Sequence, residues 1–201
     1  MIIKVCGLND SDTIRSIDAL GADLIGFIFH PASLRNVTTS HLPETTTAKV
    51  GVFVDYPIDD LLELTRQHLF KWVQLHGMES PQYVQRLSAQ GINVIKTFSI
   101  SDLLDLSNME AYAEDSAYFL FDTKGINTGG NGIKFDWTLL EDYNLPTPFI
   151  LSGGIGPSDI QKIRNIQHPH FAGIDINSQF EIRPGIKNIS LVKSFIDEFK
   201  N

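Results

Sequence analysis

Eight short runs of β-branched and aromatic residues recur along this chain of 201 residues, with stretches of helical character between them. Each run predicts a buried strand, and the alternation with helices predicts parallel β/α units. The predicted strands are Ile2–Cys6, Leu24–Phe29, Lys49–Val54, Trp72–Leu75, Asn93–Thr97, Tyr118–Asp122, Pro148–Leu151 and Phe171–Ile176. Their spacing of roughly 20 to 30 residues is that of repeated β/α units. The pattern favours eight strands that close into a barrel.

Capping side chains or a proline precede the first, fourth and seventh predicted helices, at Ser11-Asp12, Ser80-Pro81 and Pro157-Ser158-Asp159. The seventh and eighth intervals give the strongest helix signals. The fifth interval, Ser101 to Ala113, has moderate helical character, so we expect a short or distorted helix there. The prediction is an α/β protein, a single (β/α)8 TIM barrel domain over residues 1–201.

A doubly wound open sheet would give a similar alternation. A dinucleotide-binding sheet of that kind carries G-x-G-x-x-G after its first strand, whereas Cys6-Gly7-Leu8-Asn9 stands there. The glycine-rich segments instead follow the sixth and seventh strands, and barrels place phosphate sites in such late loops. This difference favours the barrel.

Charge and cysteine content limit the partners and the compartment. The formal net charge is -8 and no run of like charges occurs, so we expect neither a nucleic-acid nor a membrane partner. Cys6 is the one cysteine, which fits a reducing cytoplasm without disulfides. Met1 to Asp10 lacks a signal peptide's apolar stretch, and the longest apolar run, Leu24 to Phe29, is too short to span a bilayer. We therefore expect a soluble cytoplasmic protein.

Side chains at the carboxyl ends of barrel strands face one shared mouth. Cys6 ends the first predicted strand and Asp122 ends the sixth. A thiol and a carboxyl can act as base and acid when their pKa values lie near the working pH. A lone cysteine is as often a small buried hydrophobe, and Asp122 could instead cap a helix or form an ion pair. The residues alone leave these alternatives open.

Polar and glycine-rich segments follow three late strands. Thr128-Gly129-Gly130-Asn131-Gly132 lets backbone N–H groups approach an anion or a ring, although it could be only a flexible loop. Ser152-Gly153-Gly154-Ile155-Gly156-Pro157 runs into a helix N-terminus, which favours anions. Asp175-Ile176-Asn177-Ser178 adds polar groups after the eighth strand. Together the last two segments predict a phosphate site.

Arg35 and His76 follow the second and fourth strands. A guanidinium can bind a carboxylate through two parallel hydrogen bonds, although an exposed arginine is usually only solvated. His76 could line the pocket or satisfy a local backbone group. His168 and His170 lack the helical spacing of a metal pair, so we predict no metal. Without a Walker sequence or a serine nucleophile elbow, nucleotide hydrolysis and acyl transfer have no support.

An ordered set of motifs carries a resemblance to a known family. The motifs are Lys4-Val5-Cys6-Gly7, Gly21-Ala22-Asp23, Ile25-Gly26-Phe27 with Ser33 and Arg35, Gly51-Val52-Phe53-Val54, Val73-Gln74-Leu75-His76-Gly77, Phe121-Asp122-Thr123, Gly129-Gly130-Asn131-Gly132 with Phe135-Asp136-Trp137, Ser152-Gly153-Gly154 and Gly173-Ile174-Asp175. In this order, along the whole chain, they resemble the phosphoribosylanthranilate isomerase family.

The resemblance implies an Amadori rearrangement of N-(5-phosphoribosyl)anthranilate in tryptophan biosynthesis, without a cofactor. It implies that Asp122 is the general acid, Cys6 the general base and Arg35 the ligand of the anthranilate carboxylate. Gly154, Asn177 and Ser178 would hold the phosphate of the small-molecule substrate. The other substrate-binding residues that we expect are His76, Gly129, Gly130, Gly153 and Asp175. Members of the family are monomers or dimers, so either a monomer or a homodimer is expected.

Two positions depart from the family pattern: Asn131 replaces a threonine, and Gln179 replaces a small residue beside the phosphate site. A first rival interpretation is the similar histidine-pathway isomerase, which uses two aspartates, so Cys6 argues against it. A second is a barrel that only binds a phosphorylated metabolite. The presence of both Cys6 and Asp122 argues against that interpretation.

Overall fold

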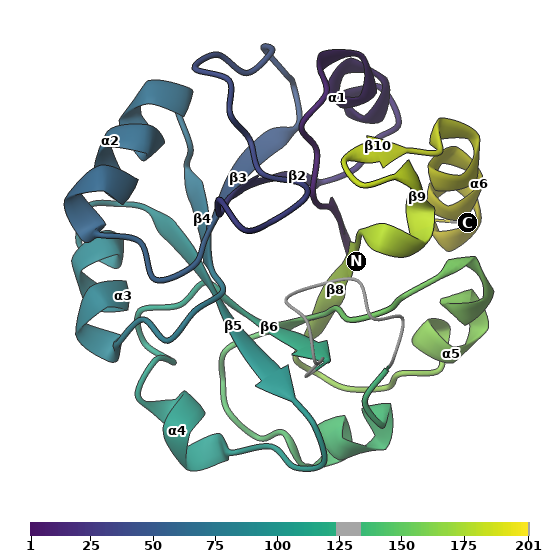
Figure 1. Ribbon diagram of the computed structural model, residues 1–201. Helices are drawn as coiled ribbons and strands as arrows, with labels where there is room; N and C mark the ends of the chain where they lie inside the picture. Colours follow the sequence, from purple (N-terminus) through teal and green to yellow (C-terminus); the bar gives the residue numbers. More distant parts are fainter. Residues whose placement is uncertain (124–133, 201) are drawn as a thin grey trace.

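The computed structural model describes residues 1–123 and 134–200, and eight parallel strands form a closed barrel. The strands are β1 (Ile2–Val5), β2 (Leu24–Phe29), β3 (Ala48–Phe53), β4 (Trp72–Leu75), β5 (Asn93–Ile100), β6 (Tyr118–Thr123), β7 (Phe149–Leu151) and β8 (Phe171–Ile176). Pairing of β8 with β1, which sets Lys4 beside Asp175, closes the ring. Figure 1 looks along the barrel, with the helices outside the strands. The predicted barrel and its eight strands are confirmed.

Six α-helices occur in the described residues: α1 (Ser11–Asp18), α2 (Ile58–His68), α3 (Pro81–Ser88), α4 (Leu106–Glu110), α5 (Ile160–Arg164) and α6 (Ile189–Lys200). Asp10 caps α1 by accepting a hydrogen bond from Thr13 N at 2.9 Å, and Ser80 caps α3 through Tyr83 N. The predicted start of the helix after the fourth strand is therefore confirmed, and so is the short fifth-interval helix, α4. No helix of the described part of the chain is long and apolar enough to cross a membrane.

One helix prediction is wrong. Residues 30–47, all of them described, contain no helix, although the alternation predicted one after the second strand. This segment is rich in β-branched and capping residues, and Asp18 holds it by accepting hydrogen bonds from the N–H groups of Thr46 and Thr47. The predicted seventh helix is confirmed: a 3-10 turn, Pro157–Asp159, continues into the five-residue α5, and Asp159 accepts a hydrogen bond from Gly156 N at its start. The eighth helix, α6, is confirmed.

Two separate apolar cores fill the structure. One contains helix residues such as Ile14 and Leu61, so it lies between the strands and the surrounding helices. The buried members of the other come from strands, apart from Cys6 directly after β1, so it fills the barrel interior. These inner residues are Cys6, Leu24, Val50, Val52, Ile95, Leu120 and Ile150. Because side chains alternate along a strand, Lys4 lies on the inner face between Ile2 and Cys6.

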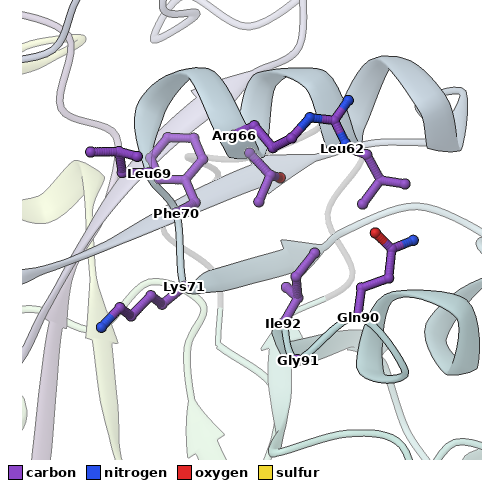
Figure 2. A pocket seen from close by; sticks show the side chains of 9 residues that line it. Leu62, Arg66, Leu69, Phe70, Lys71, Gln90, Gly91 and Ile92 are labelled. Carbon is purple, nitrogen blue, oxygen red and sulfur yellow. The ribbon is translucent and has the colours of Figure 1, made fainter.

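A hairpin that the sequence did not predict follows β8. It consists of β9 (Glu181–Arg183) and β10 (Ile186–Lys187), and Figure 1 shows it beside α6. At the opposite, amino-terminal end of the strands, the segments entering β4 and β5 line a groove with Leu62, Phe70 and Ile92 (Figure 2). None of the predicted site residues lines this groove. The hairpin, in contrast, lies at the site.

Candidate active site

Cys6 lies at the carboxyl end of β1 and is only 4% exposed. Gly26 on β2 makes room for its sulfur, since a β-carbon at Gly26 would lie 2.7 Å from Sγ. Two residues earlier, the fully buried Lys4 donates a hydrogen bond from Nζ to Oδ2 of Asp175 at 3.0 Å. The thiol therefore stands beside a buried ion pair on the inner face of the barrel.

The charges around Cys6 act against one another. Burial raises the pKa of the Cys6 thiol above its ordinary value, while the charges of Lys4 and Lys187 oppose that rise. Burial also lowers the pKa of Lys4, but the charges of Asp175 and Cys6 outweigh it and leave that pKa raised. Lys4 therefore stays cationic, and it can stabilise a Cys6 thiolate.

Asp122 occupies the end of β6 on another side of the mouth. Its Oδ2 lies 3.3 Å from Nε2 of His76, which follows β4. The Gln74 side-chain amide lies 3.1 Å from Nδ1 of the same imidazole, and it also donates to Thr97 Oγ1. With Gln74 donating to Nδ1, the neutral tautomer of His76 carries its proton on Nε2 and points it at Asp122. The contact with His76 supports the alternative that Asp122 forms an ion pair. The Asp122 carboxyl nevertheless still lies in the mouth of the barrel.

Asp175 connects the two sides. Burial is the main cause that raises the pKa of Asp175, the charge of Lys4 opposes this rise, and the charge of Asp122 adds to it. Asp175 also raises the pKa of Cys6. A single buried carboxylate therefore lies within electrostatic reach of both the thiol and Asp122. Its second oxygen, Oδ1, has no hydrogen-bond partner among the described residues.

Arg35 and Asn177 meet over Gly7. A β-carbon at Gly7, whose φ is +77°, would lie 2.7 Å from Cδ of Arg35 and 2.6 Å from Oδ1 of Asn177. The Arg35 guanidinium is not free: it donates from Nε and Nη2 to Glu181 on the hairpin, at 2.9 and 2.6 Å. Lys187 donates to Asn177 Oδ1 and to Glu181, at 2.7 and 2.8 Å.

The loop after β7 packs against the acid. Gly153 and Gly154 both have positive φ, and a β-carbon at Gly153 would lie 2.9 Å from Asp122 Oδ1. Among the residues that the structure describes, none accepts a hydrogen bond from the N–H groups of these two glycines. The adjoining helix start is capped by Asp159, which accepts from Gly156 N at 2.7 Å. An anion at this loop would therefore meet glycine N–H groups rather than a free helix N-terminus.

The structure thus gathers seven of the predicted residues around one mouth: Cys6, Arg35, His76, Asp122, Gly153, Asp175 and Asn177. Gly154 and Ser178 are their chain neighbours. Three predicted positions, Gly129, Gly130 and Asn131, lie outside the described residues. Gln179, the other position that departs from the family pattern, is exposed and lies close to Gly156. Sequence reasoning missed Lys4, Glu181 and Lys187. No group of three or more histidine, cysteine, aspartate or glutamate side chains in the described ranges could hold a metal ion.

A closed eight-stranded barrel with a thiol and a carboxyl at the carboxyl ends of its strands defines the class of (β/α)8-barrel enzymes. The family model described as N-(5'phosphoribosyl)anthranilate (PRA) isomerase matches residues 3–198. The chain belongs to this family, and it is an isomerase of tryptophan biosynthesis.

Relatives and solved structures agree with this assignment. N-(5'-phosphoribosyl)anthranilate isomerase from Parabacteroides distasonis is 43% identical over 205 residues, covering 98% of this chain and 93% of the relative. The isomerase from Phocaeicola vulgatus is 41% identical over 203 residues, covering 100% and 98%. The crystal structure of the isomerase from Thermotoga maritima has a TM-score of 0.84 at 30% identity, covering 100% of this chain and 99% of that one. Another isomerase structure, in complex with reduced 1-(o-carboxyphenylamino)-1-deoxyribulose 5-phosphate, has a TM-score of 0.83 at 28% identity, with the same coverage.

Proposed function

We propose that this isomerase converts N-(5'-phosphoribosyl)anthranilate into 1-(2-carboxyphenylamino)-1-deoxyribulose 5-phosphate with Asp122 as general acid and Cys6 as general base. The observation that carries the proposal is that Cys6 and Asp122 lie at the carboxyl ends of two separate barrel strands, β1 and β6, with the buried Asp175 of β8 within electrostatic reach of both. A substrate in the mouth therefore meets a proton donor and a proton acceptor on different sides.

The chemistry needs one proton delivered and one removed. Asp122 gives its proton to the ring oxygen as the bond from that oxygen to C1 breaks, and the nitrogen lone pair forms the C1–N iminium. The Cys6 thiolate takes the C2 proton, and the electrons of that C–H bond move to the iminium and neutralise its nitrogen. The resulting enolamine then tautomerises to the ketone product. Lys4 stabilises the thiolate form of Cys6 through its charge.

Two anionic ends of the substrate need separate binding groups. Arg35 binds the anthranilate carboxylate, and the N–H groups of Gly153 and Gly154 bind the phosphate together with Asn177 and Ser178. Lys187 occupies Oδ1 of Asn177, so the amide NH₂ of that side chain is left to donate to an anion. A phosphate or sulfate ion in a crystal should lie between these two loops, and an ion elsewhere in the mouth with the loops turned away would contradict this assignment.

The decay of the fluorescence of the anthranilate substrate tests the function directly. The pure protein should remove the signal catalytically, whereas a barrel that only binds a metabolite would not. Cys6→Ala and Asp122→Asn should each reduce kcat at least about a hundredfold, the lower range for general acid–base catalysis. Both variants should still bind the reduced product analogue. Near-parental turnover in either variant would contradict its assigned role.

Location and assembly are proposed on the same basis. Cys6 must stay reduced to accept a proton, which supports a cytoplasmic location. The oligomeric state is a monomer or a homodimer. One solved relative is described as monomers generated from a dimeric isomerase of Thermotoga maritima. Sedimentation of the purified chain distinguishes the two states.

A further inference from the structure

The hairpin after β8 presents a buried carboxylate, Glu181, to the proposed substrate-binding arginine. The Glu181 side chain is 4% exposed and that of Arg35 13%, and the two form a bidentate pair. Burial opposes ionisation of Glu181, but hydrogen bonds from Arg35 and the charge of Lys187 outweigh it and hold the pKa of Glu181 below its ordinary value. Glu181 is therefore ionised at neutral pH.

The donors of the guanidinium show what this pairing leaves for a ligand. Arg35 carries five N–H donors, and Glu181 occupies Nε and one side of Nη2. The second N–H of Nη2 and one N–H of Nη1 form the other donor edge of the same plane. Two cations, Arg35 and Lys187, share the single carboxylate of Glu181, so the cluster keeps one net positive charge.

The hairpin itself is held firmly. Glu181 Oε1 accepts hydrogen bonds from Lys187 Nζ at 2.8 Å and from Gly185 N at 3.1 Å. One carboxylate therefore joins the two ends of the hairpin. Gly185 has a φ of +86°, and a β-carbon there would overlap Asn9 in the loop after β1. The carboxylate that pairs with Arg35 is therefore fixed relative to both β1 and β8.

We propose that Glu181 is a positioning residue for substrate recognition: it holds one edge of the Arg35 guanidinium so that the other edge receives the anthranilate carboxylate. The proposal rests on the role of Arg35 proposed above. An arginine without such a partner would lose side-chain entropy on binding, and Glu181 removes part of that cost in advance. Glu181 thereby acts on carboxylate recognition and not on the proton transfers.

Two ligands separate positioning from a general structural role. One is the reduced product analogue with its carboxyl group, and the other is the same molecule made from aniline, which lacks it. Glu181→Gln should weaken binding of the carboxylated ligand by about tenfold or more, and binding of the aniline ligand by less than about twofold. In turnover, KM should rise much more than kcat falls. Glu63→Gln, an exposed change on α2, is the matched control and should alter neither ligand.

Each outcome decides the proposal. Equal weakening of both ligands by Glu181→Gln, or no weakening of either, would overturn it. If Glu181→Gln does not fold, Glu181→Asp keeps the charge but shortens the reach, and it should weaken the carboxylated ligand selectively. Arg35→Ala should abolish the preference for the carboxylated ligand. If Arg35→Ala keeps that preference, the proposed role of Arg35 fails, whereas a loss confined to Arg35→Ala rejects Glu181 alone.

Discussion

The two sides of the mouth differ in how their reactive groups are surrounded. On the base side, Cys6 is 4% exposed and Lys4 is fully buried. On the acid side, the side chains of Asp122 and His76 are 20% and 32% exposed. Charges interact more strongly where water is excluded, so the pKa of the base, Cys6, depends strongly on the charges beside it. The acid is screened by water and depends less on any one partner.

This difference predicts an order of effects. Removing the base itself should be most damaging, changing the charge beside it should be intermediate, and changing the partner of the acid should be least damaging.

Cys6→Ser should reduce kcat at least about a hundredfold, nearly as much as Cys6→Ala. A hydroxyl has a far higher pKa than a thiol and is a poor base near neutral pH, although its size is similar. Steady-state turnover of the two variants, with thermal unfolding to confirm folding, measures this. A serine variant with turnover close to the parental value would leave the thiol as a packing group and place the base elsewhere in the mouth.

Raising the pH above neutrality should increase the thiolate fraction of Cys6 in the unmodified protein, measured as ultraviolet thiolate absorbance, because burial holds the pKa of Cys6 above its ordinary value despite Lys4. The thiolate fraction grows about tenfold per pH unit below that pKa. The raised pKa also makes the stability of the folded state depend on pH. The contribution of Cys6 to stability is fully present at pH values below the pKa of the thiol in the unfolded chain. It is lost as the pH rises through the pKa of the thiol in the folded protein. Cys6→Ala should remove that part of the pH dependence of unfolding. A thiolate signal already fully present at neutral pH would contradict the raised pKa of Cys6.

Lys4→Met should lower activity at neutral pH by about tenfold, because losing the positive charge beside Cys6 raises the pKa of the thiol further and leaves less thiolate. Formation of the Cys6 thiolate should move to higher pH. The change also leaves Asp175 as an unpaired buried carboxylate, which costs about 3 to 5 kcal/mol of stability. Thiolate absorbance against pH, turnover at neutral pH and unfolding in denaturant measure these effects separately.

A double variant, Lys4→Met with Asp175→Asn, provides the control for Lys4. Removing both charges should restore most of the stability, because no unpaired ion remains. Asp175→Asn also removes a charge that raises the pKa of Cys6, so thiolate formation should move part of the way back but stay displaced toward alkaline pH, because Lys4 acts on Cys6 more strongly than Asp175 does. If the Lys4→Met single variant showed no alkaline displacement of thiolate formation, Lys4 would act on folding and not on the thiol.

The barrel could be predicted because its strands are marked by local pattern. Leu24–Phe29, Trp72–Leu75 and Phe171–Ile176 were predicted with their observed bounds, since β-branched and aromatic residues in short runs mark buried parallel strands. Strand ends then located Cys6 and Asp122. Residues 30–47 lack a helix because capping residues and contacts with Asp18 override the expected alternation.

Glu181 and Lys4 were not predicted from the sequence as site residues, for two different reasons. Glu181 and Arg35 are 146 residues apart, and the strands of the hairpin have only three and two residues, which is too short for a periodic signal. Pairing of distant charges depends on tertiary geometry. Lys4 did carry a usable signal, because two-residue periodicity places it on the same face as Cys6. A charged residue two positions before a candidate nucleophile or base on a barrel strand therefore merits inclusion in the predicted site.

His76→Gln should reduce kcat by less than about tenfold, because pairs exposed to water contribute little and glutamine can still donate a hydrogen bond toward Asp122. His76→Ala, which removes that donor, is the companion variant and should lose more. Turnover of both, compared with Asp122→Asn, measures how far the acid depends on its partner. If His76→Gln lost as much activity as Asp122→Asn, the two side chains would donate the proton as one unit. The acid side would then depend on its neighbour as strongly as Cys6 depends on Lys4, and exposure would not explain the difference between the two sides of the mouth.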